Sequence, residues 1–223
     1  MGGDRRDAYF ATRFSHDPRR EVLWETLCRH YFSRYISESD CVLELGAGYG
    51  HFINNIAGGR RIGLDAWEGF VQYLRPEIES RVGDVTDLSF LAPASVNFVF
   101  ASNLFEHIGQ ESFASVLDQL KRVLVRNGTL NLLQPNYYYA YREYFDDYTH
   151  RTVYSHTSLC DFLDAHGYDV IECKPRLLPL TIKSRLPVSS ALVRIYLLSP
   201  WKPAGKQMFV RARPRISGGG GTP

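Results

Sequence analysis

The chain has 223 residues, of which 44% are aliphatic, aromatic or cysteine and 22% are charged, a composition that suits one globular domain with a full core. No uncharged apolar run approaches the roughly 18 residues needed to span a bilayer, and the start MGGDRRDAYF lacks an apolar signal segment, so we expect a cytoplasmic protein. The cysteines form no close pairs along the sequence, which favours reduced, buried thiols over disulfides or zinc ligands. They are Cys28, Cys41, Cys160 and Cys173.

The net charge of +2 is unevenly distributed along the chain. Ten Lys or Arg and no Asp or Glu lie between Cys173 and the end, whereas residues 1–172 carry 16 basic and 24 acidic residues. Such an asymmetry has two interpretations. Either the basic segment packs on its own acidic domain, or it marks an anionic partner.

A helix is predicted over residues 19–36. Pro18 suits the first turn of a helix, and apolar residues between Val22 and Tyr35 recur near helical spacing. A polar turn over 38–40 then leads to the next element. We therefore treat residues 1–40 as an N-terminal helical cap.

The stretch CVLELGAGYGH, residues 41–51, predicts a buried strand that runs into a glycine-rich turn. Glycines suit a tight turn that a ligand approaches closely, because no Cβ stands in the way. A helix is predicted over 51–56, and amides at a helix start face such a ligand. His51 occupies the sixth position of the dinucleotide fingerprint G-x-G-x-x-G, and the third glycine comes one place early, at Gly50.

A second strand, residues 60–65, ends on Asp65, about twenty residues beyond the glycine turn. Doubly wound sheets place an acidic residue there to bind ribose hydroxyls. A carboxylate suits a diol because it offers two acceptor oxygens to two donors. A short helix is predicted over 68–74.

Three segments resemble the class I S-adenosylmethionine-dependent methyltransferases. The pattern E-x-G-x-G-x-G, which starts at Glu44, resembles their first motif, and RVGDVTDL over 81–88 resembles their third. The run LKRVLVRNGTLNL resembles their L-x-x-x-L-x-P-G-G-x-L segment, with Asn127 in place of the proline. The resemblance covers roughly residues 19–213. It implies that the N-terminal helix either helps to cover the cofactor or only packs on the sheet edge.

The resemblance also implies a set of residues that bind S-adenosylmethionine. Asp84 would accept a hydrogen bond from the adenine amino group and the Val85 amide would meet the ring, unless Asp84 only caps a turn. The full predicted set is Glu44, Gly46, Ala47, Gly48, Gly50, Asp65, Ala66, Asp84, Val85, Ser102 and Asn103.

A buried strand over 96–101 is followed by SNLFEH, residues 102–107. Ligands of open α/β sheets bind at the carboxyl ends of strands. His107 is therefore either a general base, since imidazole titrates near neutral pH, or a structural residue. An amphipathic helix over 110–125 and a strand over 129–133 come next.

The segment 134–156 holds seven tyrosines, two aspartates and two histidines, and it should border the active site because it follows the carboxyl end of a strand. Aromatic faces beside carboxylates suit a sugar, another polyol or a planar acceptor, and we assign substrate contact to Tyr138, Tyr141 and Tyr144. The alternative is a tyrosine-rich cover with no chemistry. The candidates for a base are His150, His156 and Asp147. No metal is predicted, because the Asp-Asp-x-x-His pattern lacks a recognised ligand set.

The remaining elements complete the predicted sheet. A helix over 157–166, capped by Thr157 or Ser158 and stopped by a glycine, precedes a strand over 168–173. The last strand is expected over 205–213. Residues 177–203 form an insertion with an amphipathic stretch, which could be a lid, a dimer face or a peripheral membrane contact. Residues 214–223 are expected to be a disordered tail.

Together these features predict one α/β domain over residues 41–213. The resemblance implies a Rossmann-like, doubly wound, seven-stranded sheet with an antiparallel last strand. The predicted function is methyl transfer from S-adenosylmethionine, most simply to an oxygen of a small molecule or sugar in glycan or natural-product biosynthesis. The oligomeric state stays open.

Three alternative functions stay open. The first is a non-catalytic S-adenosylmethionine-binding or scaffold protein. The second is a nicotinamide-dependent reductase, which His51 and the missing glycine disfavour. A nucleic-acid methyltransferase is the third, but the Asp/Asn-Pro-Pro-Tyr/Phe motif is absent, since Asn136 is followed by tyrosines. We therefore predict no nucleic-acid partner.

Overall fold

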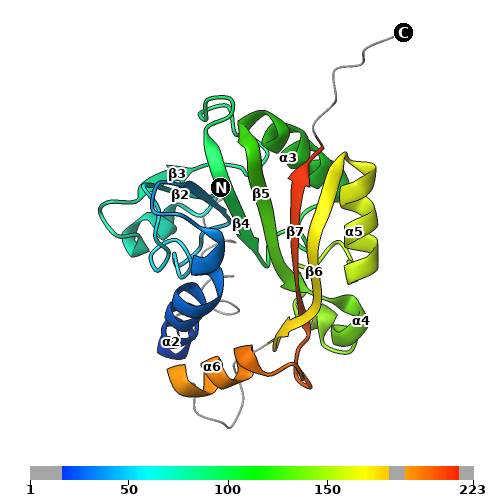
Figure 1. The fold of residues 1–223 in the computed structure, drawn as a ribbon. Helices are drawn as coiled ribbons and strands as arrows, with labels where there is room; N and C mark the ends of the chain where they lie inside the picture. The colour runs from blue at the N-terminus through cyan, green and yellow to red at the C-terminus, as the bar shows by residue number, and fades with distance from the viewer. Residues whose placement is uncertain (1–16, 181–188, 216–223) are drawn as a thin grey trace.

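The structure, a computed structural model, describes residues 17–180 and 189–215. Its seven strands form one sheet in the order β3-β2-β1-β4-β5-β7-β6 (Figure 1). Strands β1 to β5 pair in parallel, and β7 lies antiparallel between β5 and β6. The predicted fold class is therefore confirmed. The strands are β1 Cys41–Leu45, β2 Arg60–Asp65, β3 Glu79–Val82, β4 Val96–Ser102, β5 Leu124–Pro135, β6 Tyr168–Leu178 and β7 Gln207–Pro214.

Helices cover both faces of the sheet. The α-helices are α2 Pro18–Leu27, α3 Gln110–Val123, α4 Tyr137–Ala140, α5 His156–Ala165 and α6 Ser190–Leu198. The shorter turns are the π-helix η1 Cys28–Phe32 and the 3₁₀ helices η2 Ser33–Tyr35, η3 Glu68–Tyr73 and η4 Tyr144–Asp146. The predicted N-terminal helix thus consists of α2 continued by η1 and η2.

Two local predictions need correction. Residues 51–56 form turns instead of a helix. The side chains of Asn54 and Asn55 bond to the carbonyls of Tyr73 and His51, and such bonds compete with a helix. The cap of α5 is Ser155, whose side chain accepts from the amide of Ser158 in a capping box.

The alternation of side chains along β4 divides the core into two layers. Val99 and Ala101 belong to the cluster that packs on α3 and α5, whereas Phe98 and Phe100 belong to the cluster that packs on α2 and η1. Successive residues of a strand point to opposite faces, so a sheet covered on both sides needs apolar residues at every position.

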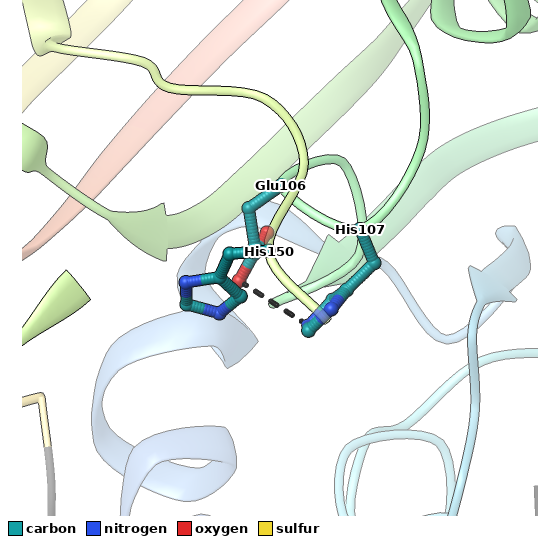
Figure 2. A group of neighbouring side chains, drawn as sticks. All are labelled: Glu106, His107 and His150. Atoms are coloured by element: carbon teal, nitrogen blue, oxygen red, sulfur yellow. Dashed lines mark ion pairs between the residues drawn. The ribbon is translucent and has the colours of Figure 1, made fainter. Parts of the chain in front are cut away.

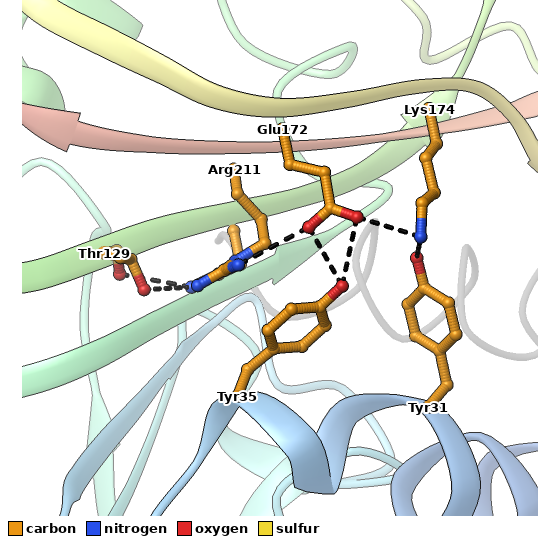
Figure 3. Close-up of polar contacts among 7 residues, drawn as sticks. Tyr31, Tyr35, Thr129, Glu172, Lys174 and Arg211 are labelled. Atoms are coloured by element: carbon orange, nitrogen blue, oxygen red, sulfur yellow. Dashed lines mark hydrogen bonds and ion pairs between the residues drawn. The ribbon is translucent and has the colours of Figure 1, made fainter.

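A polar network ties the N-terminal helices to the last two strands (Figure 3). The carboxylate of Glu172 on β6 accepts from the Tyr35 hydroxyl at 2.9 Å and pairs with Lys174 at 2.9 Å and Arg211 at 3.4 Å. Lys174 also donates to the Tyr31 hydroxyl. Lysine and arginine from the end of the chain are here paired with a carboxylate of the same chain.

The same holds for two more basic residues of this segment. Lys206 pairs with Glu143, and Arg215 pairs with Asp169. These contacts support the interpretation that the basic segment packs on its own acidic domain.

The prediction of four buried thiols is confirmed for two of the four cysteines. Cys28 and Cys41 are buried thiols as predicted, but Cys160 is half-buried and Cys173 is exposed.

No helix within the described part of the chain is both long and apolar enough to cross a membrane. Residues 181–188 of the predicted insertion and 216–223 of the predicted tail lie outside the described residues.

Candidate functional site

The glycine turn follows β1 at the point where the strand order reverses between β1 and β4. Gly46, Gly48 and Gly50 have φ angles of +70°, +50° and +65°, a region that side chains disfavour. A Cβ at Gly50 would lie 2.6 Å from the side chain of Leu74. The turn therefore requires glycine, and it lies at the switch point where such sheets bind ligands.

Asp65 holds this turn from the neighbouring strand. One oxygen of its carboxylate accepts from the Gly48 amide at 2.8 Å, and the other accepts from the Trp67 amide at 2.8 Å. A carboxylate oxygen can accept more than one hydrogen bond, which is why this residue type suits a diol. Ala66, which follows it, is half-buried.

Glu44 lies beneath the turn and is 4% exposed. Its carboxylate accepts from the Ile53 amide at 3.0 Å. Burial raises the pKa of this carboxyl well above its ordinary value. This geometry supports the turn from inside, and Ala47 is likewise buried.

The third motif lies just beyond the end of β3. Asp84 is exposed, and one of its oxygens accepts from both the amide and the hydroxyl of Thr86, which is the turn-capping arrangement. Val85 is buried. At the end of β4, Ser102 and Asn103 are half-buried, and Asn103 has a φ of +50°.

The structure brings together three of the predicted candidates for a base. The Thr149 hydroxyl contacts His107 Nδ1 at 2.9 Å and the Asp147 carboxylate at 2.6 Å. The rings of His107 and His150 lie 4.8 Å apart between centroids. Burial lowers the pKa of His107 to about 4.

Glu106 completes this group and was missed in the sequence interpretation (Figure 2). Its side chain is fully buried, and Oε1 lies 4.0 Å from His107 Nε2. Burial raises its pKa to about 8. Its position directly before His107 in a loop after a buried strand was the available signal. The backbone carbonyl of Glu106 also accepts from Arg151 and Thr152, which fastens the second loop to the first.

The remaining predicted acceptor residues are spread more widely. His156 Nδ1 contacts the Asn136 amide at 3.0 Å, away from the Glu106–His107–His150 group. Tyr144 is buried and donates to the Thr152 carbonyl at 2.5 Å, so its hydroxyl has a structural partner. Tyr138 and Tyr141 are 66% and 53% exposed.

A glycine turn at the switch point, an acid at the end of the adjacent strand and a β7 strand inserted antiparallel define the class I methyltransferase fold. Residues 43–132 match the family model described as a methyltransferase domain. Residues 43–132 thus match a methyltransferase domain, and the chain has the fold of the class I methyltransferases, whose cofactor is S-adenosylmethionine.

Solved structures agree with this assignment. A SAM-dependent methyltransferase from Archaeoglobus fulgidus matches with a TM-score of 0.66 and 20% identity over 93% of this chain and 98% of that chain. A chain of a complex containing the Haloferax volcanii Trm112 methyltransferase activator matches with a TM-score of 0.72 and 20% identity, over 99% and 100% of the two chains.

DhpI in complex with S-adenosylhomocysteine matches with a TM-score of 0.58 and 16% identity over 95% and 92% of the two chains. At these identities the likeness concerns the fold. A comparison with curated protein sequences finds no significant match.

Proposed function

We propose that the protein methylates an oxygen of a small molecule or sugar, with S-adenosylmethionine as the methyl donor. The observation that carries this proposal is the bond between the Asp65 carboxylate and the Gly48 amide at 2.8 Å. It joins an acceptor suited to ribose hydroxyls to a glycine turn suited to the methionine part of the cofactor.

In this proposal the cofactor lies across the carboxyl ends of β1 to β4. The ribose hydroxyls donate to Asp65, while the adenine lies beside Asp84 and Val85. The second oxygen of Asp84 is available to the adenine amino group, because the turn with Thr86 uses the first. Ser102 and Asn103 then border the methionine moiety from the end of β4.

The reaction needs no covalent intermediate on the protein, which mainly has to align the acceptor oxygen with the methyl group. A lone pair of the acceptor oxygen forms the new C–O bond, the S–CH₃ bond breaks with its electrons going to sulfur, and S-adenosylhomocysteine leaves. Holding acceptor and methyl in line supplies much of the rate. The acceptor hydroxyl must also lose its proton.

Activation of that hydroxyl is assigned to the loops that carry His107 and His150. These two imidazoles and Asp147 converge beyond β4, whereas His156 bonds to Asn136. The exposed rings of Tyr138 and Tyr141 provide apolar faces for an acceptor. Tyr144 is proposed to support the loop from inside.

The test is calorimetric titration of the purified chain with S-adenosylhomocysteine, with NADH as the control ligand. We expect micromolar binding of the first and none of the second. An acceptor panel with sugars and small phenols follows, with labelled S-adenosylmethionine. Turnover only on protein or RNA would refute the acceptor class, and tight binding without turnover of any acceptor would favour a non-catalytic binding protein.

A further inference from the structure

The side chains of Glu106, His107 and His150 form one group that two separate loops bring together (Figure 2). Each contributes one ligand-type atom, and these atoms all lie within 4.8 Å of one another. The side chain of His107 is 20% exposed, whereas that of Glu106 is fully buried. The group is thus open to solvent on the histidine side and closed on the carboxylate side.

The protonation of His107 follows from its contacts. Thr149 Oγ lies between the Asp147 carboxylate and His107 Nδ1, and a carboxylate only accepts hydrogen bonds. The Thr149 hydroxyl proton therefore goes to Asp147 at 2.6 Å. The contact of 2.9 Å between Thr149 Oγ and His107 Nδ1 must then be an N–H donating to oxygen. The lone pair of neutral His107 is consequently on Nε2, which faces Glu106.

His150 lies beside His107, with 4.8 Å between the ring centroids. Its Nδ1 is buried with no hydrogen-bond partner among the described residues. This nitrogen can therefore act as a ligand atom when the imidazole is neutral. The contact that Thr149 makes with the other nitrogen of His107 is typical of histidines that bind metals.

The buried carboxyl group of Glu106 is the feature that favours a bound cation. Both oxygens of its carboxyl group are buried without a hydrogen-bond partner among the described residues, and a buried polar group left unpaired costs free energy whether it is protonated or ionised. His107 Nε2 lies 4.0 Å from Oε1, which is too far for a hydrogen bond. A cation between the three side chains would give the Glu106 carboxyl group and His150 Nδ1 a partner at once.

We propose that Glu106, His107 and His150 bind one divalent first-row transition-metal ion. Two imidazoles and one carboxylate suit Zn²⁺, Mn²⁺, Fe²⁺ or Co²⁺ better than Mg²⁺ or Ca²⁺, which prefer oxygen ligands. With bonds of about 2.1 Å, tetrahedral ligand atoms lie roughly 3.4 Å apart. The group closes to this spacing by side-chain shifts of about 1 Å.

Three protein ligands leave coordination positions open on the exposed side of the site, as in catalytic metal sites. This assignment rests on the proposed function: the acceptor hydroxyl would take one of these positions, where a bound metal would make its proton easier to lose to water on the exposed side. His107 and His150 would then act as metal ligands, and Asp147 with Thr149 as positioning residues for His107.

The experiment starts from protein stripped with a chelator and dialysed. Titration with Co²⁺ is followed by visible absorption, and Zn²⁺ is then added as competitor. We expect one equivalent of Co²⁺ to bind, Zn²⁺ to displace it and Mg²⁺ to leave it bound. Glu106→Gln and His150→Gln should each weaken Co²⁺ binding at least tenfold, whereas His30→Ala, at an exposed position, should bind as the unmodified protein does.

S-adenosylhomocysteine binding is measured on the same samples and separates the two proposals. Loss of Co²⁺ binding with intact S-adenosylhomocysteine affinity shows that the variants are folded and supports the metal site. Absence of Co²⁺ and Zn²⁺ binding by the unmodified protein overturns the metal site and leaves the methyltransferase proposal standing. Equal Co²⁺ binding by Glu106→Gln and the unmodified protein overturns it as well, since the carboxylate would then be protonated and not a ligand.

Discussion

Replacing Asp65 with alanine tests the cofactor site most directly. The structure assigns this carboxylate two backbone donors, the amides of Gly48 and Trp67, each at 2.8 Å. A hydrogen bond to a charged group contributes about 1.5–3 kcal/mol. Alanine removes both bonds, so the unliganded protein should lose about 2–4 kcal/mol of stability, discounted for the partial exposure of the site. Chemical denaturation without ligand measures this loss.

The same substitution should weaken S-adenosylhomocysteine binding by about 1–3 kcal/mol, which is about 5–150-fold in Kd. Calorimetry at a temperature where the variant stays folded measures it. Asp87→Ala is the matched control, because within residues 17–180 and 189–215 the Asp87 side chain accepts a hydrogen bond from the Ser89 amide of its own exposed turn and from no more distant residue. An Asp65→Ala Kd within twofold of the unmodified protein would remove Asp65 from the cofactor site.

Three other substitutions probe the rest of the site. His150→Ala should lower turnover on any identified acceptor and leave S-adenosylhomocysteine affinity unchanged, and full turnover would rule out a role for this imidazole. Tyr144→Phe should cost about 1–3 kcal/mol in urea unfolding, since it leaves the Thr152 carbonyl without its donor; an unchanged midpoint would contradict this. Glu44→Gln removes a carboxyl whose pKa is raised by burial. Above about pH 4.5 the unfolded carboxyl ionises first, so the stability of the variant relative to the unmodified protein should rise between pH 5 and 8, by at most about 1.4 kcal/mol per pH unit. Thermal unfolding of both proteins at several pH values measures this difference in stability. A difference that stays constant between pH 5 and 8 would show that burial does not raise the pKa of Glu44.

The proposed cofactor side of the site, which consists of the glycine turn and Asp65, could be predicted from the sequence because its signals are local. The turn from Gly46 to Gly50 needs positive φ angles at three glycines within five residues, and only glycine adopts them freely. Strand β2 ends on Asp65 as predicted, since the continuous buried run Ile62, Gly63 and Leu64 stops at a charged residue. Where local signals compete, as in residues 51–56, asparagine side chains overrode the expected helix.

The proposed acceptor side of the site, which consists of the loops that carry Glu106, His107 and His150, depends on contacts between residues far apart in the sequence. Thr149 meets His107 across 42 positions of sequence, and the Glu106 carbonyl meets the amides of Arg151 and Thr152. Seven tyrosines drew the prediction toward ring contacts, yet Tyr144 is buried and supports the loop. Burial of Glu106 becomes visible only when the second loop folds over the first.

Asn103 lies in the chain between strand β4 and the Glu106–His107–His150 group. Its backbone adopts a φ of +50°, which asparagine tolerates better than most residues, and its amide donates to the Leu133 carbonyl on β5. Its side-chain oxygen accepts from Gln207 at the start of β7. Because Glu106 follows three residues later, the turn at Asn103 helps to set where the Glu106–His107–His150 group lies. The antiparallel β7 strand therefore contacts the loop that carries this group as well as closing the sheet.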